Sequence, residues 1–552
     1  MMKSRIFKII TFIFILILIS IFVIFAYRQL RNILKFPVSD KTRSETSIET
    51  TSSEGETKIE ITSYEKSEKE TKKTDQETDS IEESIEIKEF FKDKESLKNI
   101  LNEYTVQVKF LPEDMQLECK LQLEYTNFED DKLDKLYFHL YPRAYDEYSD
   151  DSFKIITDLT GKDLNELDIV PGKMEITKLL VDGIEINYKI EQTLCEIDLE
   201  KPINPDEILE ITIEFYQNIP KNADRYGYYK DVVSLGNWSP ILAVYDDDGW
   251  HKDPFLPIGD PFYSDSSIYE VEISLPENYV LASTGELINT KKIDDYITYT
   301  YEAYPVRDFA IMFSKEYGVL EDNYHDINIY SFLIVEDLEK NKNSLNFAKD
   351  AIDIFSELFG KYPYQNYTIA QNFMNFGGME YPQLCQIKYA DYNDKKISCY
   401  RNEYVIAHET AHQWWYSVVG NDEINQPWLD EAFAEYSTYQ YFINKYSEEE
   451  RENIFSTMHR KPRSIEVPPK VMSKTIRDYE DFGEYGAEIY KGGSELLFKL
   501  EDHLGKEVMY EILRRYYEEY KFENADITGF IDICEEVSEK DLSEFFSPYF
   551  DN

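Results

Sequence analysis

Residues 408–416 read HETAHQWWY, in which two histidines stand four positions apart and a glutamate directly follows the first. Residues four apart lie on one face of a helix, so His408 and His412 can direct imidazole nitrogens at one cation with Glu409 beside it. A catalytic zinc takes three protein ligands and keeps a fourth position open for water. Unless the pattern is only a helix with polar surface residues, the fold must bring a third ligand to these two histidines.

Glu431 is the candidate for that third ligand. It follows His412 after eighteen intervening residues, within the stretch QPWLDEAFAEY. Asn425 can cap a new helix there, and Pro427 suits the first turn of that helix. Gly420 is expected to end the helix that carries the histidines, so that the chain turns and sets the second helix against the first.

The segment HETAHQWWYSVVGNDEINQPWLDEAFAEY resembles the zinc-ligand segment of the M1 (gluzincin) aminopeptidases, whose pattern is H-E-x-x-H, eighteen residues and then E. Upstream, FGGMEYPQL is similar to the G-x-M-E-N exopeptidase motif of that family at Gly377, Met379 and Glu380, with Gly378 between them. Tyr381 stands where the family usually has Asn. The resemblance implies that residues 377–380 contact the substrate and that Glu380 pairs with its free α-ammonium group.

Downstream, IYKGGSELL resembles the Y-x-K-G segment of the family, with Tyr490 in the place of the catalytic tyrosine. The likeness includes SDSSIYEVEISLPENYVLASTGE and so extends from about Tyr104 to the end of the chain. It implies an α+β protein with a saddle-like antiparallel β domain followed by a mainly helical, thermolysin-like catalytic domain. We expect the large C-terminal helical domain of many relatives to be absent.

The resemblance and ordinary zinc chemistry together imply one Zn²⁺ per chain, held by His408, His412 and Glu431. Zinc lowers the pKa of its bound water towards about 7 and polarises the scissile carbonyl. Glu409 is expected to act as general base, and Tyr490 to donate a hydrogen bond to the oxyanion. The implied reaction is removal of N-terminal residues from peptides. A zinc endopeptidase of the same fold, or a non-catalytic peptide-binding surface module, are the alternatives.

Three further residues near the motif have predicted roles. Glu435 lies one helical turn after Glu431 and either orients a histidine ligand or is a solvated surface group. Trp414 and Trp415 are predicted to pack in the protein interior rather than to contact substrate. No partner pattern accompanies the other histidines, which are His139, His251, His325, His459 and His503.

Apolar residues recur with period two from about Tyr104 to Ala310, which predicts half-buried strands. In MQLECKLQLEY, residues 115–125, the apolar side chains alternate with polar ones. The stretches ILEITIEF and SIYEVEISL repeat the pattern near 208–215 and 267–275. We therefore expect an antiparallel β domain over residues 101–318.

After about Leu320 the period of the apolar residues changes to that of a helix. SLNFAKDAIDIFSELFG has this spacing and ends on Gly360. Strands are expected around NYTIAQN and CQIKYA. We assign residues 319–552 to the catalytic domain and expect further helices over 403–419, 427–446 and 487–504.

The N-terminal region has a different character. Residues 9–27, IITFIFILILISIFVIFAY, contain no charged side chain and are long enough to cross a bilayer. No small-residue cleavage site follows, so we expect an uncleaved transmembrane anchor after a short tail, residues 1–8. Basic residues on both sides leave the orientation open, but a long downstream domain translocates largely regardless of such charges. We expect a single-pass protein of the cell membrane with an extracytoplasmic catalytic domain.

Residues 28–100 are rich in Ser, Thr, Glu and Lys, as in SETSIETTSSEGETKIEITSYEKSEKETKKTDQETDS. Such a composition cannot bury a core, which predicts a disordered stalk between membrane and folded head. A helical stalk is the alternative.

The charge and cysteine content exclude some classes of function. A formal net charge of -49 argues against nucleic-acid binding, because phosphate contacts need a basic face. The 5 cysteines are widely spaced and contain no C-x-x-C pair, so neither a disulfide framework nor a thiolate metal site is indicated.

Overall fold

A computed structural model of the chain describes residues 94–146, 157, 161–163, 166–335, 342–389, 395–460, 463 and 465–550. The predicted tail, anchor and nearly all of the predicted stalk lie outside these residues. No helix in the described ranges is long and apolar enough to cross a membrane. The folded part begins before the expected end of the stalk at residue 100, because Leu97 in α3 (Lys94–Leu97) is fully buried.

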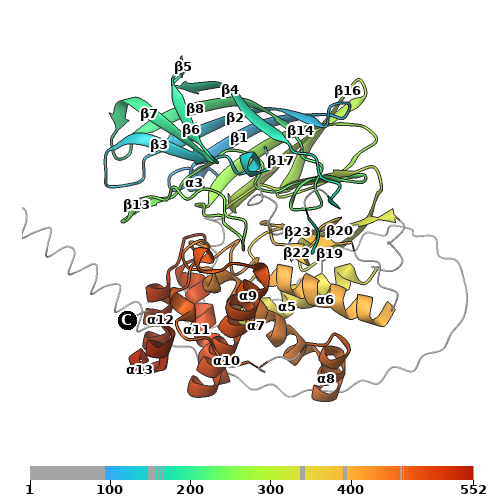
Figure 1. Cartoon of the computed structure of the whole chain (residues 1–552), viewed down its shortest axis with the longest axis vertical. Helices are drawn as coiled ribbons and strands as arrows, with labels where there is room; N and C mark the ends of the chain where they lie inside the picture. Colours follow the sequence, from blue (N-terminus) through green and yellow to red (C-terminus); the bar gives the residue numbers. More distant parts are fainter. Residues whose placement is uncertain are drawn as a thin grey trace, which may run out of the picture. The chain divides into compact units, whose positions relative to one another are not determined.

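The N-terminal half of the described chain is built from β sheets (Figure 1). Its largest sheet has eight strands within the described residues. In spatial order they are β16 (Glu286–Ile293), β17 (Tyr296–Val306), β14 (Ser267–Pro276), β1 (Glu103–Leu111), β2 (Gln116–Thr126), β8 (Ile208–Asn218), β4 (Lys173–Val181) and β5 (Ile184–Glu185). The predicted strands near 115, 208 and 267 are thus confirmed as β2, β8 and β14. The expected antiparallel order needs one correction, since β1 and β14 pair in parallel.

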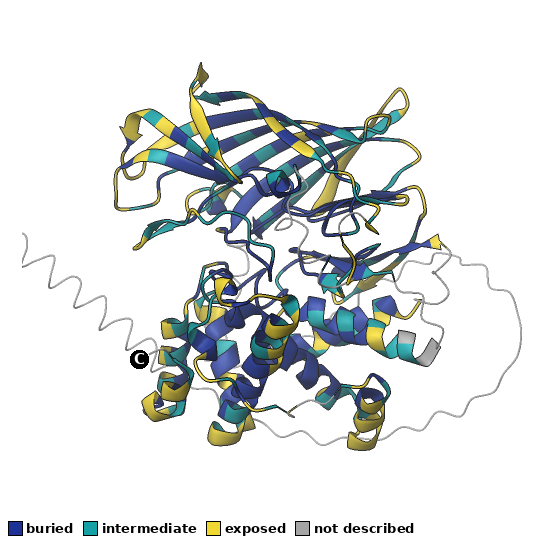
Figure 2. Cartoon of the chain, viewed as in Figure 1, coloured by how far each residue is buried: buried dark blue, intermediate teal, exposed yellow. Residues whose placement is uncertain are grey.

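Apolar and polar residues alternate along these strands, which gives the sheet a buried face. Leu117, Leu121 and Leu123 of β2 are each at most 1% exposed, whereas the residues between them reach the other face. Figure 2 shows the same striping of buried and exposed residues across the large sheet. Burial of these leucines stabilises the fold by about 2 kcal/mol each.

Smaller sheets complete this half of the described chain. One sheet comprises β15 (Val280–Ser283), β18 (Ile311–Ser314), β10 (Val232–Leu235) and β9 (Tyr226–Tyr229). Another comprises β11 (Ile241–Leu242), β3 (Leu133–His139), β7 (Leu194–Ile203) and β6 (Tyr188–Glu191), and a separate hairpin pairs β12 (Tyr245–Asp246) with β13 (Gly249–Trp250). A 3₁₀ turn, η1 (Tyr141–Tyr145), follows β3.

The C-terminal half combines a mixed sheet with a set of helices (Figure 1). The sheet has the order β19 (Tyr317–Tyr324), β20 (Ile327–Ile334), β21 (Asn366–Asn372), β23 (Leu384–Lys388) and β22 (Gly378–Met379). The helices are α5 (Ser344–Phe359), α6 (Lys395–Ala411), α7 (Trp428–Lys445), α8 (Glu448–Thr457), α9 (Phe482–Tyr485), α10 (Gly493–Leu504), α11 (Lys506–Glu519), α12 (Ile527–Ser538) and α13 (Ser543–Phe546). A π-helical segment, η6 (Gly486–Gly492), joins α9 to α10, and short 3₁₀ turns are η4 (Val471–Ser473), η5 (Ile476–Asp478) and η7 (Ser547–Tyr549). A sheet-rich domain followed by a helical one agrees with the predicted fold class.

Helix α7 lies at the centre of the helical domain. Its residues from Trp428 to Phe442 are all buried, including the charged Asp430, Glu431 and Glu435 (Figure 2). A helix that is buried all round is expected only in the middle of a large core. Buried charges on such a helix need partners, and those partners lead to the site described next.

Candidate active site

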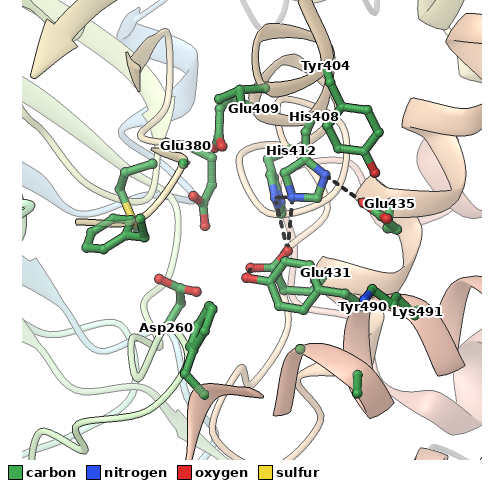
Figure 3. Close-up of a pocket in the computed structure, with 18 of the residues that line it drawn as sticks. Asp260, Glu380, Tyr404, His408, Glu409, His412, Glu431, Glu435, Tyr490 and Lys491 are labelled. Carbon is green, nitrogen blue, oxygen red and sulfur yellow. Dashed lines mark hydrogen bonds and ion pairs between the residues drawn. The ribbon is translucent and has the colours of Figure 1, made fainter. Parts of the chain in front are cut away.

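The three predicted metal ligands converge. His408 lies in the last turn of α6, His412 directly after that helix, and Glu431 in the first turn of α7 (Figure 3). Glu431 Oε2 is 3.2 Å from His408 Nε2 and 3.4 Å from His412 Nε2, and the two imidazole nitrogens are 3.3 Å apart. Ligand atoms placed 2.0–2.1 Å from a tetrahedral zinc are about 3.3–3.4 Å from one another. The donor set and its spacing therefore fit zinc.

Helix α6 ends at Ala411, so the predicted helix over 403–419 is wrong in its second half. The backbone turns back on itself, with Ser417 N donating to His412 O at 2.9 Å. Trp414 and Trp415 are buried as predicted and donate their indole N–H groups to Gly360 O and Ser437 Oγ, in different directions. Such tertiary contacts outweigh helix propensity.

The predicted helix signals between the two ligand helices act differently. Gly420 does not end α6 but donates to Glu523 O at 3.0 Å, and the Arg307 guanidinium occupies the space that a side chain at position 420 would need. Asn425 does not cap α7; its side chain donates to Asp422 Oδ2 at 2.6 Å. Pro427 is the N-cap residue of α7, one position before the first turn in which it was predicted to lie.

Each histidine has a buried carboxylate on the side away from the metal position. His412 Nδ1 donates to Asp430 Oδ1 at 2.5 Å, and Glu435 Oε2 lies 3.5 Å from His408 Nδ1 (Figure 3). Carboxylates in this position fix the orientation and tautomer of a metal-ligating imidazole. The structure thus places Glu435 where the orienting role requires it. Asp430 was missed, although its position directly before Glu431 was a usable signal.

Glu409 lies on the other side of the ligands, against the short strand β22. It is 4% exposed, and burial together with neighbouring carboxylates raises its pKa well above its usual range. A Cβ atom on Gly378 would lie 2.4 Å from Glu409 Oε1, so the absence of a side chain at 378 leaves room for this carboxylate. A carboxylate oxygen each from Glu409 and Glu380 and a ring nitrogen of His412 lie within 4.8 Å of one another.

Glu380 and Asp260 face each other across the pocket (Figure 3). Glu380 is 3% exposed, and its Oε1 has no hydrogen-bond partner among the described residues. Asp260 comes from the loop before β14 in the sheet-rich domain and accepts a hydrogen bond from Arg225 Nη1. Burial raises the pKa of both carboxyl groups. Asp260 could not be found from the sequence, because nothing in LPIGDPF links this loop to the metal motif.

Tyr490 reaches the ligands from η6, which replaces the first part of the α-helix expected over 487–504. Its hydroxyl donates to Glu431 Oε1, and its ring stacks on that of His408 with centroids 5.8 Å apart. The wider turn of a π-helix is rare and often marks a functional position. Close packing of Gly493 against Ala432 brings the end of this segment onto α7.

Tyr381, the departure from the family motif, points away from the pocket. Its hydroxyl donates to Asn237 Oδ1 at 2.8 Å, and its ring lies where a side chain on Gly236 would be. The ring is fully buried in a cluster that also contains Met379. The presence of Tyr instead of Asn at position 381 therefore affects the contact between the two domains rather than the lining of the pocket.

These groups line a cavity of about 390 Å³. Its described walls combine the ligands and carboxylates above with Phe376, Gly377 and Met379, with Arg225 from the sheet-rich domain and with Tyr404, Arg460, Phe482 and Lys491. The predicted substrate-contacting residues 377–380 are all among them.

The remaining histidines lie outside this cavity. His139 is buried, and its pKa is lowered to about 4 by that burial. His251 had no predicted role. It lies between two carboxylates, with Asp246 Oδ2 2.7 Å from Nε2 and Asp422 Oδ2 3.3 Å from Nδ1. His325, His459 and His503 are exposed.

The fold and ligand geometry define a candidate zinc site of the H-E-x-x-H kind, in which the third ligand is a glutamate on the following helix. Residues 343–549 match the family model described as the Peptidase family M1 domain. Over these residues the chain is similar to peptidase family M1.

Known aminopeptidases resemble the chain beyond residues 343–549. Aminopeptidase N of Lactococcus lactis subsp. lactis is 23% identical over 419 residues, which are 71% of this chain and 48% of the relative. Human glutamyl aminopeptidase is 22% identical over 384 residues, 65% of this chain and 39% of the relative. The chain thus spans half or less of the length of these relatives.

Solved structures show the same fold. An M1 zinc metallopeptidase from Deinococcus radiodurans superposes with a TM-score of 0.55 and 14% identity, covering 80% of this chain and 92% of that one. A mutant of the Deinococcus enzyme bound to a Tyr-Ser-Ala substrate gives a TM-score of 0.56 at 13% identity, with the same coverage. At this identity the likeness is one of fold.

Proposed function

We propose that the protein is a zinc-dependent aminopeptidase that hydrolyses the first peptide bond of peptides with a free N-terminus. The observation that carries the proposal is Glu380. Its carboxylate is buried beside the metal position, has an oxygen without a hydrogen-bond partner in the described residues and faces Asp260. Asp260 is already paired with Arg225, which leaves Glu380 as the buried carboxylate that favours a further cationic group, and the α-ammonium of a peptide is such a group.

The metal would be held by His408, His412 and Glu431. When bound, zinc polarises a carbonyl group and makes a coordinated water more acidic. Glu409 is placed to take a proton from the attacking water and to pass it to the leaving amine. Tyr490 would exchange its hydrogen bond to Glu431 for one to the developing oxyanion.

The ends of the pocket would fix which bond is cut. With the α-ammonium between Glu380 and Asp260, the first carbonyl of the peptide is the one that reaches the metal. An endopeptidase would need to bury uncharged chain against these carboxylates, which is unfavourable. A non-catalytic peptide-binding module would have no chemical use for a base at Glu409.

A set of matched peptides tests the proposal. We expect peptides with a free N-terminus to be cleaved at the first bond, and acetylated peptides to have about thirty- to a hundredfold lower kcat/KM. Glu380→Gln should reduce this difference by affecting free peptides more than acetylated ones. Equal cleavage of both kinds at internal bonds would favour the endopeptidase instead.

We also propose that residues 9–27 anchor the protein in the cell membrane with the catalytic domain outside the cytoplasm. The proposal rests on the uncharged sequence and on the polar segment that follows it. Protease treatment of intact cells should release the catalytic domain. Cleavage only after lysis would show the opposite orientation.

A further inference from the structure

Cations line the active-site cavity at both ends: Arg225 pairs with Asp260 at one end, and Arg460 and Lys491 lie at the other. Glu380 and Asp260 lie on one side of the metal ligands, and Glu435 and Lys491 on the other (Figure 3). Arg460 contacts Glu435 and so belongs to the second side, together with the exposed Lys491. In a chain with a net charge of -49, two cations lining one end of a small cavity need an explanation.

Arg460 is held in place by residues one helical turn from metal ligands. Its Nη1 donates to Tyr404 Oη at 2.7 Å and to Glu435 Oε1 at 3.2 Å. Its guanidinium carbon lies 3.8 Å from the centre of the Tyr404 ring. Tyr404 precedes His408 by one turn of α6, and Glu435 follows Glu431 by one turn of α7.

This support leaves the guanidinium able to bind a further anion. These two hydrogen bonds use the same nitrogen, and Tyr439 is a further hydrogen-bond partner of the guanidinium. A guanidinium has five N–H donors in a planar fork, so donors remain for another anion. The Arg460 side chain is 40% exposed, although Glu435 beneath it is only 2% exposed. The arrangement keeps a desolvated carboxylate on one side of the arginine and open cavity on the other.

The cationic surface continues away from the metal. A second cavity, of about 700 Å³, shares Arg460 with the first. It is lined by Arg451 and by Arg463, which pairs with Asp502, and Glu452 is its acidic member among the described residues. A peptide that extends from the metal site past Arg460 would therefore lie near a further arginine side chain.

We propose that Arg460, assisted by Lys491, binds a carboxylate of the peptide on the leaving side of the cleaved bond. The inference rests on the proposed aminopeptidase function, because it takes the α-ammonium to lie between Glu380 and Asp260. Arg460 is reached from His408 through one intervening carboxylate, and each residue of an extended peptide spans about 3.5 Å. The carboxylate belongs to the first or second residue after the cleaved bond. The C-terminus of a di- or tripeptide and an acidic side chain both supply that group.

A peptide series with one shared N-terminal residue tests the inference and distinguishes the two sources. Leu-Ala-Ala with a free C-terminus is compared with its C-terminal amide, and the amides of Leu-Glu-Ala and Leu-Ala-Glu add an acidic side chain. We expect a charged peptide to have about tenfold higher kcat/KM than the neutral amide. An advantage confined to the free acid would identify the C-terminus, and an advantage of the Glu amides would identify a side chain.

Substitutions then connect the advantage to the proposed residues. The ratio is the kcat/KM of a charged peptide divided by that of the neutral amide. Arg460→Gln should reduce it to a value between about 1 and 2, and Lys491→Gln should reduce it less. The ratio cancels general effects on the metal site that loss of the Glu435 contact could cause, because both peptides are cut at the same bond. Arg515→Gln, on the surface of α11, removes the same charge far from the cavity and should leave the ratio unchanged.

Equal cleavage of charged and neutral peptides would overturn the inference, as would an advantage that survives the Arg460→Gln, Lys491→Gln double substitution. The neutral amide and its acetylated form report separately on the aminopeptidase function. If neither these nor the charged peptides are cleaved by zinc-loaded protein, the proposed function fails and the inference falls with it.

Discussion

Glu409 and Glu431 are both buried carboxylates in the same site, but the structure predicts different results for the same substitution. Glu431 Oε2 is in contact with both imidazoles, so Glu431→Gln should lose bound zinc. Glu409 is not one of the three converging ligands. Glu409→Gln should therefore keep one zinc per chain and lower kcat by about a thousandfold. Metal analysis alongside peptide hydrolysis checks both outcomes, and full activity of Glu409→Gln would disprove its role as base.

Two adjacent glycines provide a second comparison at this scale. A methyl group on Gly378 would meet Glu409 Oε1 at 2.4 Å and the Gln386 carbonyl oxygen at 2.7 Å, whereas one on Gly377 would meet only Val405, at 3.6 Å. We expect Gly378→Ala to lower kcat at least tenfold by displacing the general base, while Gly377→Ala changes it less than twofold. Steady-state kinetics at equal zinc content measures this, and equal effects of the two substitutions would contradict it.

At the scale of elements, the π-helical segment η6 is what presents Tyr490 to Glu431. Tyr490→Phe keeps the ring that stacks on His408 and removes only the hydroxyl. Loss of one oxyanion donor typically lowers kcat by about a hundred- to a thousandfold. We expect that loss with unchanged zinc content and little change in KM. Unimpaired kcat in Tyr490→Phe would exclude the tyrosine from the reaction.

The elements also show what the sequence could predict. Helix periodicity was sufficient to predict that His408 and His412 share a face, whereas the choice of Glu431 as the third ligand rested on the resemblance of the motif to the M1 family. The end of α6 was mispredicted, since the indole contacts of Trp414 and Trp415 are made with distant segments. Asp260 could not be predicted from the sequence for the same reason. Its position depends on how the sheet-rich domain packs on the catalytic one, and no local pattern encodes that packing.

At the scale of the molecule, the cavity is completed by both domains. Arg225 and Asp260 enter it from the sheet-rich domain, and Tyr381 of the catalytic domain bonds Asn237 in return. Arg307 adds a buried contact, with Nη1 donating to Ser264 O at 2.8 Å and to Asn524. The catalytic domain therefore depends on its neighbour for substrate contacts as well as for burial, and changes at this junction should affect both activity and stability.

His251 connects the domains through a charge that depends on pH. It follows β13, whereas Asp422 lies between the two ligand helices, and hydrogen bonding to Asp422 with the charge of Asp246 raises the pKa of His251 to about 9. An unfolded histidine titrates near 6.5, so the stabilisation should be complete below pH 6.5, should decline as the pH rises and should be lost above about 9. Allowing for solvent screening, we expect about 1–2 kcal/mol.

The difference in Tm between the wild type and His251→Gln measures this contribution. We expect the variant to melt several degrees lower at pH 6 and the gap to close by pH 9.5, because the wild-type imidazole is then neutral. His503→Gln, on the exposed surface of α10, is the matched control and should show no such trend. A gap that stays constant from pH 6 to 9.5 would mean that His251 contributes packing alone. A gap that closes would show that part of the domain junction is a titratable ion pair.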